Sequence, residues 1–229
     1  MLMDFLERFL WYPLDHLPFI VIVLALAFTF HEFAHAYSAY KFGDTTARDQ
    51  GRVTLNPMAH LDPIGTILIL IAGFGWAKPV PVVRSRLKYP RLTGIVVSVV
   101  GPLSNLLLAV VGVALYALFA CTGWLSGASI GVHEAVYVFL NYLISINVLL
   151  FIFNLIPLPP LDGFRIVEDL SPPRVREKLD RYAQWGVFVF LLIVFIPELR
   201  AVTLTPLFGL SKPIITGLFS LFGLSVQLL

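Results

Sequence analysis

Residues 17–40 read LPFIVIVLALAFTFHEFAHAYSAY, and this stretch decides what kind of fold the chain can adopt. It is apolar for most of its length, yet its second half holds His31, Glu32 and His35. A helix rises 1.5 Å per residue, and about 20 apolar residues suffice to cross the hydrocarbon core of a bilayer. We therefore expect a transmembrane helix that carries the pattern H-E-x-x-H.

The composition of the whole chain indicates a membrane protein. Of its 229 residues, 58% are hydrophobic and 13% are charged, against about a quarter charged in ordinary soluble domains. The formal net charge is only +2, and the basic residues are scattered between apolar runs, so a nucleic-acid-binding function is excluded. A single cysteine, Cys121, allows neither an internal disulfide nor a thiolate metal cluster. Any metal must therefore bind His, Asp or Glu.

Six apolar stretches divide the chain, at 17–40, 63–77, 92–119, 135–157, 182–197 and 201–229. The second is 15 residues long, which is short for a spanning helix, so we expect it to be re-entrant. Residues 51–55 combine β-forming side chains with the turn signal Asn56-Pro57. The prediction is an all-α polytopic membrane protein with about five transmembrane helices, a re-entrant segment, and a short β-strand or hairpin near 51–57.

The basic residues predict how this chain is oriented. Thirteen of the sixteen lysines and arginines lie in three regions, around 41–52, 78–91 and 165–181, whereas the loop at 122–133 has none. Because cationic residues favour the cytoplasmic flanks of membrane helices, we expect the three regions to face the cytoplasm and residues 122–133 to face away. This arrangement requires that residues 63–77 dip into the bilayer and return.

The H-E-x-x-H pattern predicts a zinc site. Residues four apart lie on one helical face, so His31 and His35 can bind one Zn²⁺ while Glu32 lies beside it. The alternative is a buried polar cluster between packed helices. A lone charge at membrane depth costs about 2.5 to 3.5 kcal/mol on insertion scales, and a metal ion would supply the missing positive charge. The zinc site is therefore the favoured interpretation.

A catalytic zinc site uses three protein ligands and a water, so a third ligand is expected elsewhere in the chain. Asp162 is the leading candidate, because it ends residues 154–163, NLIPLPPLDG, whose prolines disfavour regular helix. Irregular backbone at membrane depth usually lines a cavity. Asp162 could equally be the N-cap of a helix that begins at Gly163. The residues alone leave both possibilities open.

Together these residues resemble the site-2 protease family of intramembrane zinc metalloproteases. Its two signatures, H-E-x-x-H in one helix and Asn-x-x-Pro followed by Leu-Asp-Gly in a later one, both stand here in the right order, with Asn154 eight residues before Asp162. The runs at 43–48, 51–57, 60–63 and 101–105 look like the compact bacterial branch, and the resemblance covers roughly residues 20–170. It implies one Zn²⁺ per chain bound by His31, His35 and Asp162, with Glu32 as general base. Asn154 would steady the substrate or its oxyanion, the alternative being a hydrogen bond in helix packing.

The resemblance also implies a function and a location. We expect hydrolysis of peptide bonds of membrane-protein substrates by zinc-activated water, in the bacterial inner (plasma) membrane, with the active site open to the cytoplasm. The expected partners are the substrate and the lipid bilayer. The expected domain is a single membrane-embedded metalloprotease domain over 1–229, with a catalytic core at about 17–170 and C-terminal helices at 182–229.

Substrate docking and the competing functions are less defined. An extended substrate could add to the edge of residues 51–57, which makes Gly51, Val53, Leu55 and Asn56 candidate substrate-binding residues. A membrane metal carrier or transporter could use the same His and Asp residues, and an inactive homologue could bind helices without cutting them. Glu32 distinguishes these functions, because hydrolysis needs a base next to the metal and transport does not.

Four further polar residues call for simpler explanations. Asn105 and Asn147 fall inside apolar spans, where they could hydrogen-bond backbone freed by Pro102 or line the cavity, but packing is the favoured interpretation. His60 and Asp62 are close enough in sequence to suggest a second metal site. Turn chemistry before Pro63 explains them with fewer assumptions.

Overall fold

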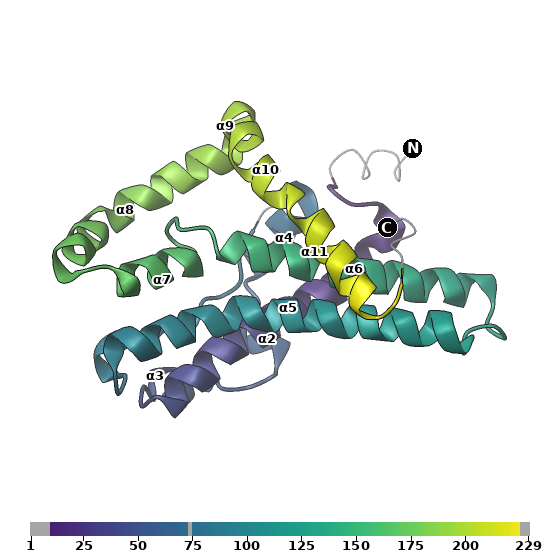
Figure 1. The fold of residues 1–229 in the computed structure, drawn as a ribbon, viewed down its shortest axis with the longest axis horizontal. Helices are drawn as coiled ribbons and strands as arrows, with labels where there is room; N and C mark the ends of the chain where they lie inside the picture. Colours follow the sequence, from purple (N-terminus) through teal and green to yellow (C-terminus); the bar gives the residue numbers. More distant parts are fainter. Residues whose placement is uncertain (1–9, 73–74, 225–229) are drawn as a thin grey trace.

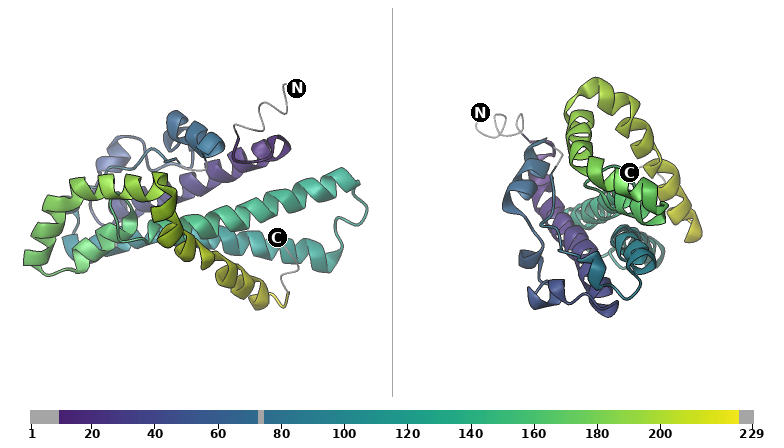
Figure 2. Two further views of the ribbon diagram at one scale, coloured as in Figure 1. Left: turned by 90° about the horizontal axis from the view of Figure 1, so that it is seen from above. Right: turned by 90° about the vertical axis from the view of Figure 1, so that its left-hand side faces the viewer.

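The computed structural model describes residues 10–72 and 75–224, and within these residues it is built of helices without any β-strand (Figure 1). The three longest helices are α2 (Leu17–Lys41), α5 (Pro90–Thr122) and α6 (Ile130–Asn154). Helices α5 and α6 lie side by side along most of their length, and α2 packs against both (Figures 1 and 2). The other helices are α3 (Thr46–Asp49), α4 (Pro63–Ala72), α7 (Asp162–Leu170), α8 (Pro173–Phe195), α9 (Pro197–Val202), α10 (Leu204–Gly209) and α11 (Ser211–Leu221), with 3₁₀ turns η1 (Leu14–His16), η2 (Pro57–Ala59) and η3 (Arg84–Arg86).

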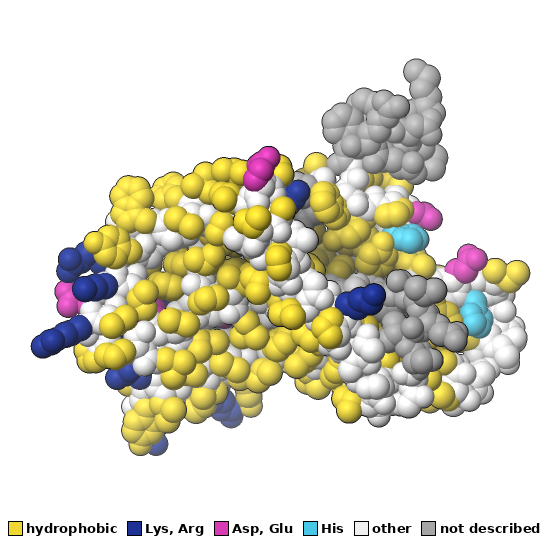
Figure 3. All heavy atoms as spheres, turned by 45° about the horizontal axis from the view of Figure 1, so that its top comes forward, with side chains coloured by type: hydrophobic (Ala, Val, Ile, Leu, Met, Phe, Trp, Pro, Cys, Tyr) yellow, Lys and Arg dark blue, Asp and Glu magenta, His cyan; other side chains and the backbone are white. Residues whose placement is uncertain are grey.

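Four helical segments among the described residues are long and apolar enough to cross a membrane, namely Leu14–Lys41, Pro90–Thr122, Ile130–Asn154 and Leu204–Leu221. Together with the apolar side chains that cover the outer surface (Figure 3), they make the chain an integral membrane protein. The sequence predicted about five spans. The difference is α8, whose first half is charged and whose apolar part, residues 182–195, would extend only about 21 Å.

The segment between α2 and α5 leaves and returns at the same end of α2. The Lys88 N–H donates to the Phe42 carbonyl over 2.8 Å, so the start and the finish of residues 42–88 lie together. In between, the Leu70 carbonyl accepts from the Trp11 N–H at 3.0 Å, beside the opposite end of α2. Helix α4, with 10 residues, extends only about 15 Å. The chain therefore runs toward the opposite end of α2 and returns to the end from which it started.

The strand or hairpin predicted near 51–57 does not form. Instead the Gly51 N–H donates to the Arg48 carbonyl and the Arg52 N–H to the Ala47 carbonyl, each at 2.8 Å, in a turn where Gly51 has a φ of +68°. Asn56 then caps η2, its Oδ1 accepting from the Met58 N–H at 3.1 Å. The prediction was wrong because a short run of β-forming residues becomes a strand only where another strand pairs with it.

Charged side chains are distributed unevenly over the molecule. Figure 3 shows Lys and Arg gathered at one end, which in Figure 1 holds the start of α5 and the turn between α7 and α8. The opposite end carries the loop between α5 and α6, which has neither lysine nor arginine. Helix α3 lies toward the same end in Figure 1, so parts of all three basic regions lie at one end of the helical bundle.

Candidate active site

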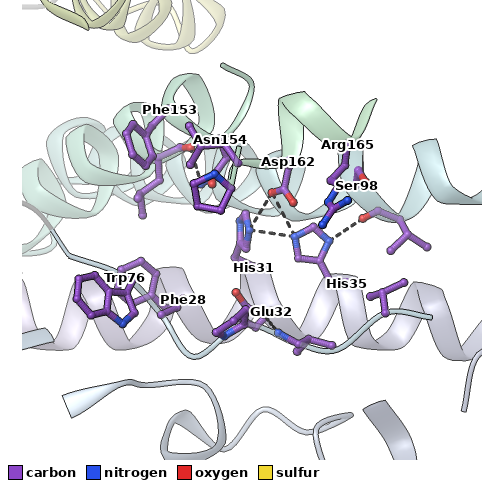
Figure 4. Close-up of a pocket in the computed structure, with 18 of the residues that line it drawn as sticks. Phe28, His31, Glu32, His35, Trp76, Ser98, Phe153, Asn154, Asp162 and Arg165 are labelled. Atoms are coloured by element: carbon purple, nitrogen blue, oxygen red, sulfur yellow. Dashed lines mark hydrogen bonds and ion pairs between the residues drawn. The ribbon is translucent and has the colours of Figure 1, made fainter. Parts of the chain in front are cut away.

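The catalytic and metal-binding residues predicted from the sequence meet at a cavity of about 840 Å³ (Figure 4). Its walls come from α2, α5, the end of α6, the start of α7, α8 and the extended segment 75–83. His31 and His35 enter it from neighbouring turns of α2, and Asp162 enters it from the first residue of α7. Residues 127 positions apart in the chain are therefore brought to one point.

These three side chains have the geometry of a metal-binding triad. Asp162 Oδ2 lies 3.2 Å from His31 Nε2 and 3.3 Å from His35 Nε2, and the two Nε2 atoms are 3.0 Å apart. Helix α7 begins at Asp162 itself, its N-cap is Leu161, and no side chain caps it. The alternative role of Asp162, as the N-cap of a helix starting at Gly163, is therefore wrong.

The hydrogen bonds of the two imidazoles test whether Zn²⁺ fits. His35 Nδ1 donates to the Val97 carbonyl at 2.6 Å, and His31 Nδ1 donates to Asn105 Oδ1 at 2.8 Å. A neutral imidazole with a proton on Nδ1 has a lone pair on Nε2. Both lone pairs point at the buried Asp162 Oδ2, which has no hydrogen-bond partner. Three acceptors without a donor repel one another, and two imidazoles with a carboxylate form a standard zinc ligand set, so the residues fit Zn²⁺.

Helix α5 approaches the histidines closely enough to contact both rings. A side chain at Gly101 would collide with His35 Nε2 and Cε1, and its Cβ would lie 2.9 Å from His31 Cε1. Val97, Gly101 and Asn105 are four residues apart and therefore lie on one face of α5. On this face, the Val97 carbonyl accepts from His35 and the Asn105 amide oxygen accepts from His31. Between them, Gly101 lets both imidazole rings pack against the helix backbone.

Glu32 lines the same cavity but points to the side of residues 75–83 (Figure 4). Its Oε2 accepts from the Val80 N–H at 2.7 Å, and the residue is buried. The carboxylate is therefore held in place next to the histidines without an ion pair to any described cation.

Asp44 fixes the chain that follows Val80. This fully buried carboxylate accepts from the Val83 N–H at 2.6 Å through Oδ2 and from the Thr46 N–H at 3.0 Å through Oδ1. Burial alone would raise the pKa of Asp44, but the hydrogen bonds from Thr46 and Val83 outweigh burial and lower the pKa below its ordinary value. The ionised form therefore anchors this wall of the cavity to the loop after α2.

An ion-pair cluster fixes the far end of α7. Arg84 Nη1 lies 2.6 Å from Asp169 Oδ1 and 3.3 Å from Glu168 Oε2, and both acids are almost completely buried. Arg165 and Arg176 add further pairs to the same acids. Burial raises the pKa of Asp169, although Arg84 and Arg176 act in the opposite direction. Helix α7, which begins with Asp162, is thus tied at its other end to η3 and α8.

Not every candidate residue reaches the cavity. Asn154 lines it, with Nδ2 donating to the Leu150 carbonyl of its own helix at 3.0 Å. The four candidate substrate-binding residues are absent from the lining and lie on the turn after α3 and at the start of η2: Gly51, Val53, Leu55 and Asn56.

The sequence reading missed two parts of the site. Residues 75–83 form a wall of the cavity, and the signal for this was Pro79 and Pro81, which favour extended backbone. For Asn105 and Asn147 the sequence favoured packing over a place in the cavity lining, whereas Asn105 lines the cavity and contacts His31 directly. No sequence signal distinguishes these two amides from other buried polar groups.

His60 and Asp62 have the local roles that the sequence favoured. Asp62 Oδ1 accepts from the Gly65 N–H at 2.8 Å, at the start of α4, and His60 Nε2 donates to the Thr54 carbonyl at 2.8 Å. Within residues 10–72 and 75–224, the triad of His31, His35 and Asp162 is the one group of three such side chains close enough to hold a metal.

Comparison with known proteins agrees with this geometry. The family model described as Peptidase family M50 matches residues 19–197. The candidate zinc metalloprotease YwhC of Bacillus subtilis is 51% identical over 217 residues, which cover 94% of this chain and 97% of that protein. Two further relatives are candidate zinc metalloproteases named Rip2. The one from Mycolicibacterium smegmatis is 28% identical, over 82% of this chain and 72% of that protein. The one from Mycobacterium tuberculosis H37Rv is 30% identical, over 94% of this chain and 80% of that protein. No solved structure matches the chain.

Proposed function

This chain belongs to peptidase family M50 and is a zinc metalloprotease, and from that premise we propose that it hydrolyses peptide bonds of membrane-protein substrates within or beside the bilayer. The observation that carries the proposal is the position of the triad. His31 lies ten residues before Lys41, so the site is about 15 Å from the end of a spanning helix, inside an apolar bundle. A substrate that reaches this depth must itself enter the membrane.

We assign metal ligation to His31, His35 and Asp162 and the role of general base to Glu32. Bound by these residues, zinc would supply Lewis acidity to the scissile carbonyl and to an adjacent water. Glu32 would take a proton from the water that attacks the carbonyl carbon and pass it to the amine as the carbon–nitrogen bond breaks. The N–H of Val80, which donates to Glu32 Oε2, holds the carboxylate in one orientation while it accepts and releases the proton.

Asn154 is assigned to the oxyanion that develops on the substrate. One N–H of its Nδ2 donates to the Leu150 carbonyl, and the second N–H of the same amide is the donor assigned to the oxyanion. The phenyl group of Phe153 lines the same cavity.

The substrate is proposed to bind in an extended form, because peptide bonds within a helix are not accessible to a nucleophile. The sequence predicted that the substrate docks at Gly51, Val53, Leu55 and Asn56, but these residues lie outside the cavity. We therefore favour the extended residues 75–83 as the docking edge, because they line the cavity directly beside Glu32. Strand addition at that edge would place an exposed amide bond next to the triad.

The remaining assignments concern the whole chain. We propose one membrane-embedded metalloprotease domain over 1–229, located in a bacterial inner membrane, with a core at about 17–170 and C-terminal helices at 182–229. Water would reach the site from the cytoplasm, because Arg84 and Arg165 line the cavity toward the end of the bundle that carries most cations. A metal carrier is not favoured, since the family is one of peptidases and Glu32 has no role in transport.

Removal of the metal tests this proposal. We expect the purified chain to contain close to one zinc, to lose cleavage of a reconstituted membrane substrate on chelation, and to regain it with Zn²⁺. His31→Ala and His35→Ala should each lower zinc content, because each removes a direct ligand. His133→Ala, which changes a histidine remote from the cavity, is the matched control. Full zinc content in both ligand variants, or chelator-resistant cleavage, would refute the proposed site.

The orientation can be measured by cysteine labelling. In a Cys121→Ala background we expect Lys41→Cys and Lys88→Cys to react with a membrane-impermeant maleimide from the cytoplasmic side, and Ser126→Cys from the other side. All three positions are exposed, and the hydrogen bond between Lys88 N–H and the Phe42 carbonyl keeps the first two at one end of the bundle. Labelling of positions 41 and 88 from opposite sides would exclude this topology.

A further inference from the structure

We propose that Asn105 and Asn147 are positioning residues of the metal site, and that together they fix the tautomer of His31 that can bind zinc. Both amides are fully buried, and they lie on different helices, α5 and α6. They are joined to each other and to His31 by an unbroken chain of hydrogen bonds, which we call the amide relay. The inference rests on the proposed ligation of zinc by His31.

The hydrogen bond at the α6 end of the amide relay fixes which atom of each amide, oxygen or nitrogen, faces the next residue. Asn147 Nδ2 donates at 2.8 Å to the carbonyl of Leu143, and a carbonyl can only accept. The amide of Asn147 therefore turns its oxygen, Oδ1, toward Asn105. The oxygen of one amide can pair only with the nitrogen of the next, so Asn105 must present Nδ2 to Asn147, and the two atoms are 2.9 Å apart.

A second carbonyl fixes Asn105 independently. Its Nδ2 also donates to the carbonyl of Ala27 on α2, at 3.2 Å. Two acceptors, the Ala27 carbonyl and Asn147 Oδ1, thus hold the same NH₂ group, and the flipped amide would face both with an oxygen. Asn105 Oδ1 is left to face His31 Nδ1 at 2.8 Å. An amide oxygen cannot donate, so the proton of the imidazole must be on Nδ1.

The position of this proton decides what the opposite nitrogen of the His31 ring, Nε2, can bind. With its proton on Nδ1, His31 directs the Nε2 lone pair at Asp162 Oδ2, 3.2 Å away, where a metal ion would be held. The opposite tautomer would place a proton at the metal position. Without the amide relay, His31 could adopt either tautomer, whereas His35 is fixed directly by the Val97 carbonyl. Outer partners of this kind typically change metal affinity by about 10- to 100-fold.

The test measures zinc affinity of the full-length detergent-solubilised protein by competition with a fluorescent chelator. Asn105→Leu keeps the side-chain size but removes the acceptor, and we expect zinc affinity to fall by about 10- to 100-fold. Asn105→Asp keeps an oxygen toward His31, and its second oxygen can carry a proton toward Asn147, so we expect most of the affinity to return. Asn147→Leu should give a smaller loss, because Ala27 still orients Asn105. The matched control is Asn141→Leu, the same substitution on α6 away from the cavity, which should leave affinity unchanged.

Melting temperatures of the metal-free variants separate positioning from packing. If Asn105 serves only packing, Asn105→Leu should lower the melting temperature, its zinc affinity should stay within about twofold of wild type, and Asn105→Asp should not restore the melting temperature. This result would overturn the proposal. If Asn105→Leu does not fold, Asn147→Leu carries the test, and unchanged affinity in that variant would also overturn it. Loss of zinc in His31→Ala together with unchanged affinity in both asparagine variants would reject the amide relay and leave the proposed function intact.

Discussion

Glu32→Gln is expected to abolish cleavage while zinc stays bound. Glutamine has the size of glutamate, and its amide oxygen can still accept from the Val80 N–H, so the wall formed by residues 75–83 should keep its position. The amide cannot take a proton at neutral pH, however, and the reaction loses its base. General-base catalysis contributes about 10²- to 10⁴-fold, which corresponds to about 3 to 5 kcal/mol of activation free energy.

The measurement compares initial rates of cleavage and zinc content in wild type and Glu32→Gln. Glu134→Gln, which removes an exposed carboxylate at the start of α6, is the control and should retain full activity. Loss of zinc together with activity would mean that Glu32 acts on the metal site rather than on the substrate. Cleavage within tenfold of wild type would exclude Glu32 as the general base.

Asp162→Ala is expected to remove both zinc and activity. The carboxylate is the one contribution to the triad from outside α2, and without it the two imidazoles would retain only two of the three ligands that catalytic zinc sites use. We expect zinc affinity to fall by more than the about 100-fold that loss of an outer partner can cause. Because Leu161 occupies the N-cap position of α7, the loss of about 0.5 to 2 kcal/mol that follows removal of a capping side chain should not occur.

Zinc titration and thermal unfolding of the metal-free protein give the two readouts for Asp162→Ala. Asp180→Ala, on the exposed part of α8, controls for the loss of a carboxylate. An active enzyme with normal zinc content would show that the third ligand lies elsewhere. A large drop in the melting temperature of the metal-free variant would instead indicate that Asp162 holds α7 in place by itself.

The sequence predicted best what depends on local spacing. His31 and His35 are one helical turn apart, so their common face follows from helix geometry. Asp162 could be singled out because the prolines between Asn154 and Asp162 break regular helix, but its distance to the histidines depends on how α7 packs against α5. The ion pairs of Arg84 that tie α7 in place join residues more than 80 positions apart, and no local pattern predicts them.

The sequence-based predictions failed where the structure of a segment depends on residues far away in the chain. Residues 51–55 have β-forming side chains, but none of the residues that the structure describes forms a strand beside them, and the backbone turns instead. The wall at 75–83 was overlooked because an extended segment without regular structure has no periodic signal. Asn147 could not be placed in the site from the sequence, because its role depends on α2, α5 and α6 meeting at one point.

The face of α5 formed by Val97, Gly101 and Asn105 couples metal binding to helix packing. Each of its contacts with the imidazoles depends on the relative register of α2 and α5, and a slip of one residue would move the carbonyl and the amide by about 1.5 Å. Zinc can then bind tightly only in one register. By mass action the metal stabilises that packing in return, by about 2.7 kcal/mol at a free zinc concentration one hundred times Kd. Zinc bound at this triad would therefore select the assembled bundle, in addition to its part in the reaction.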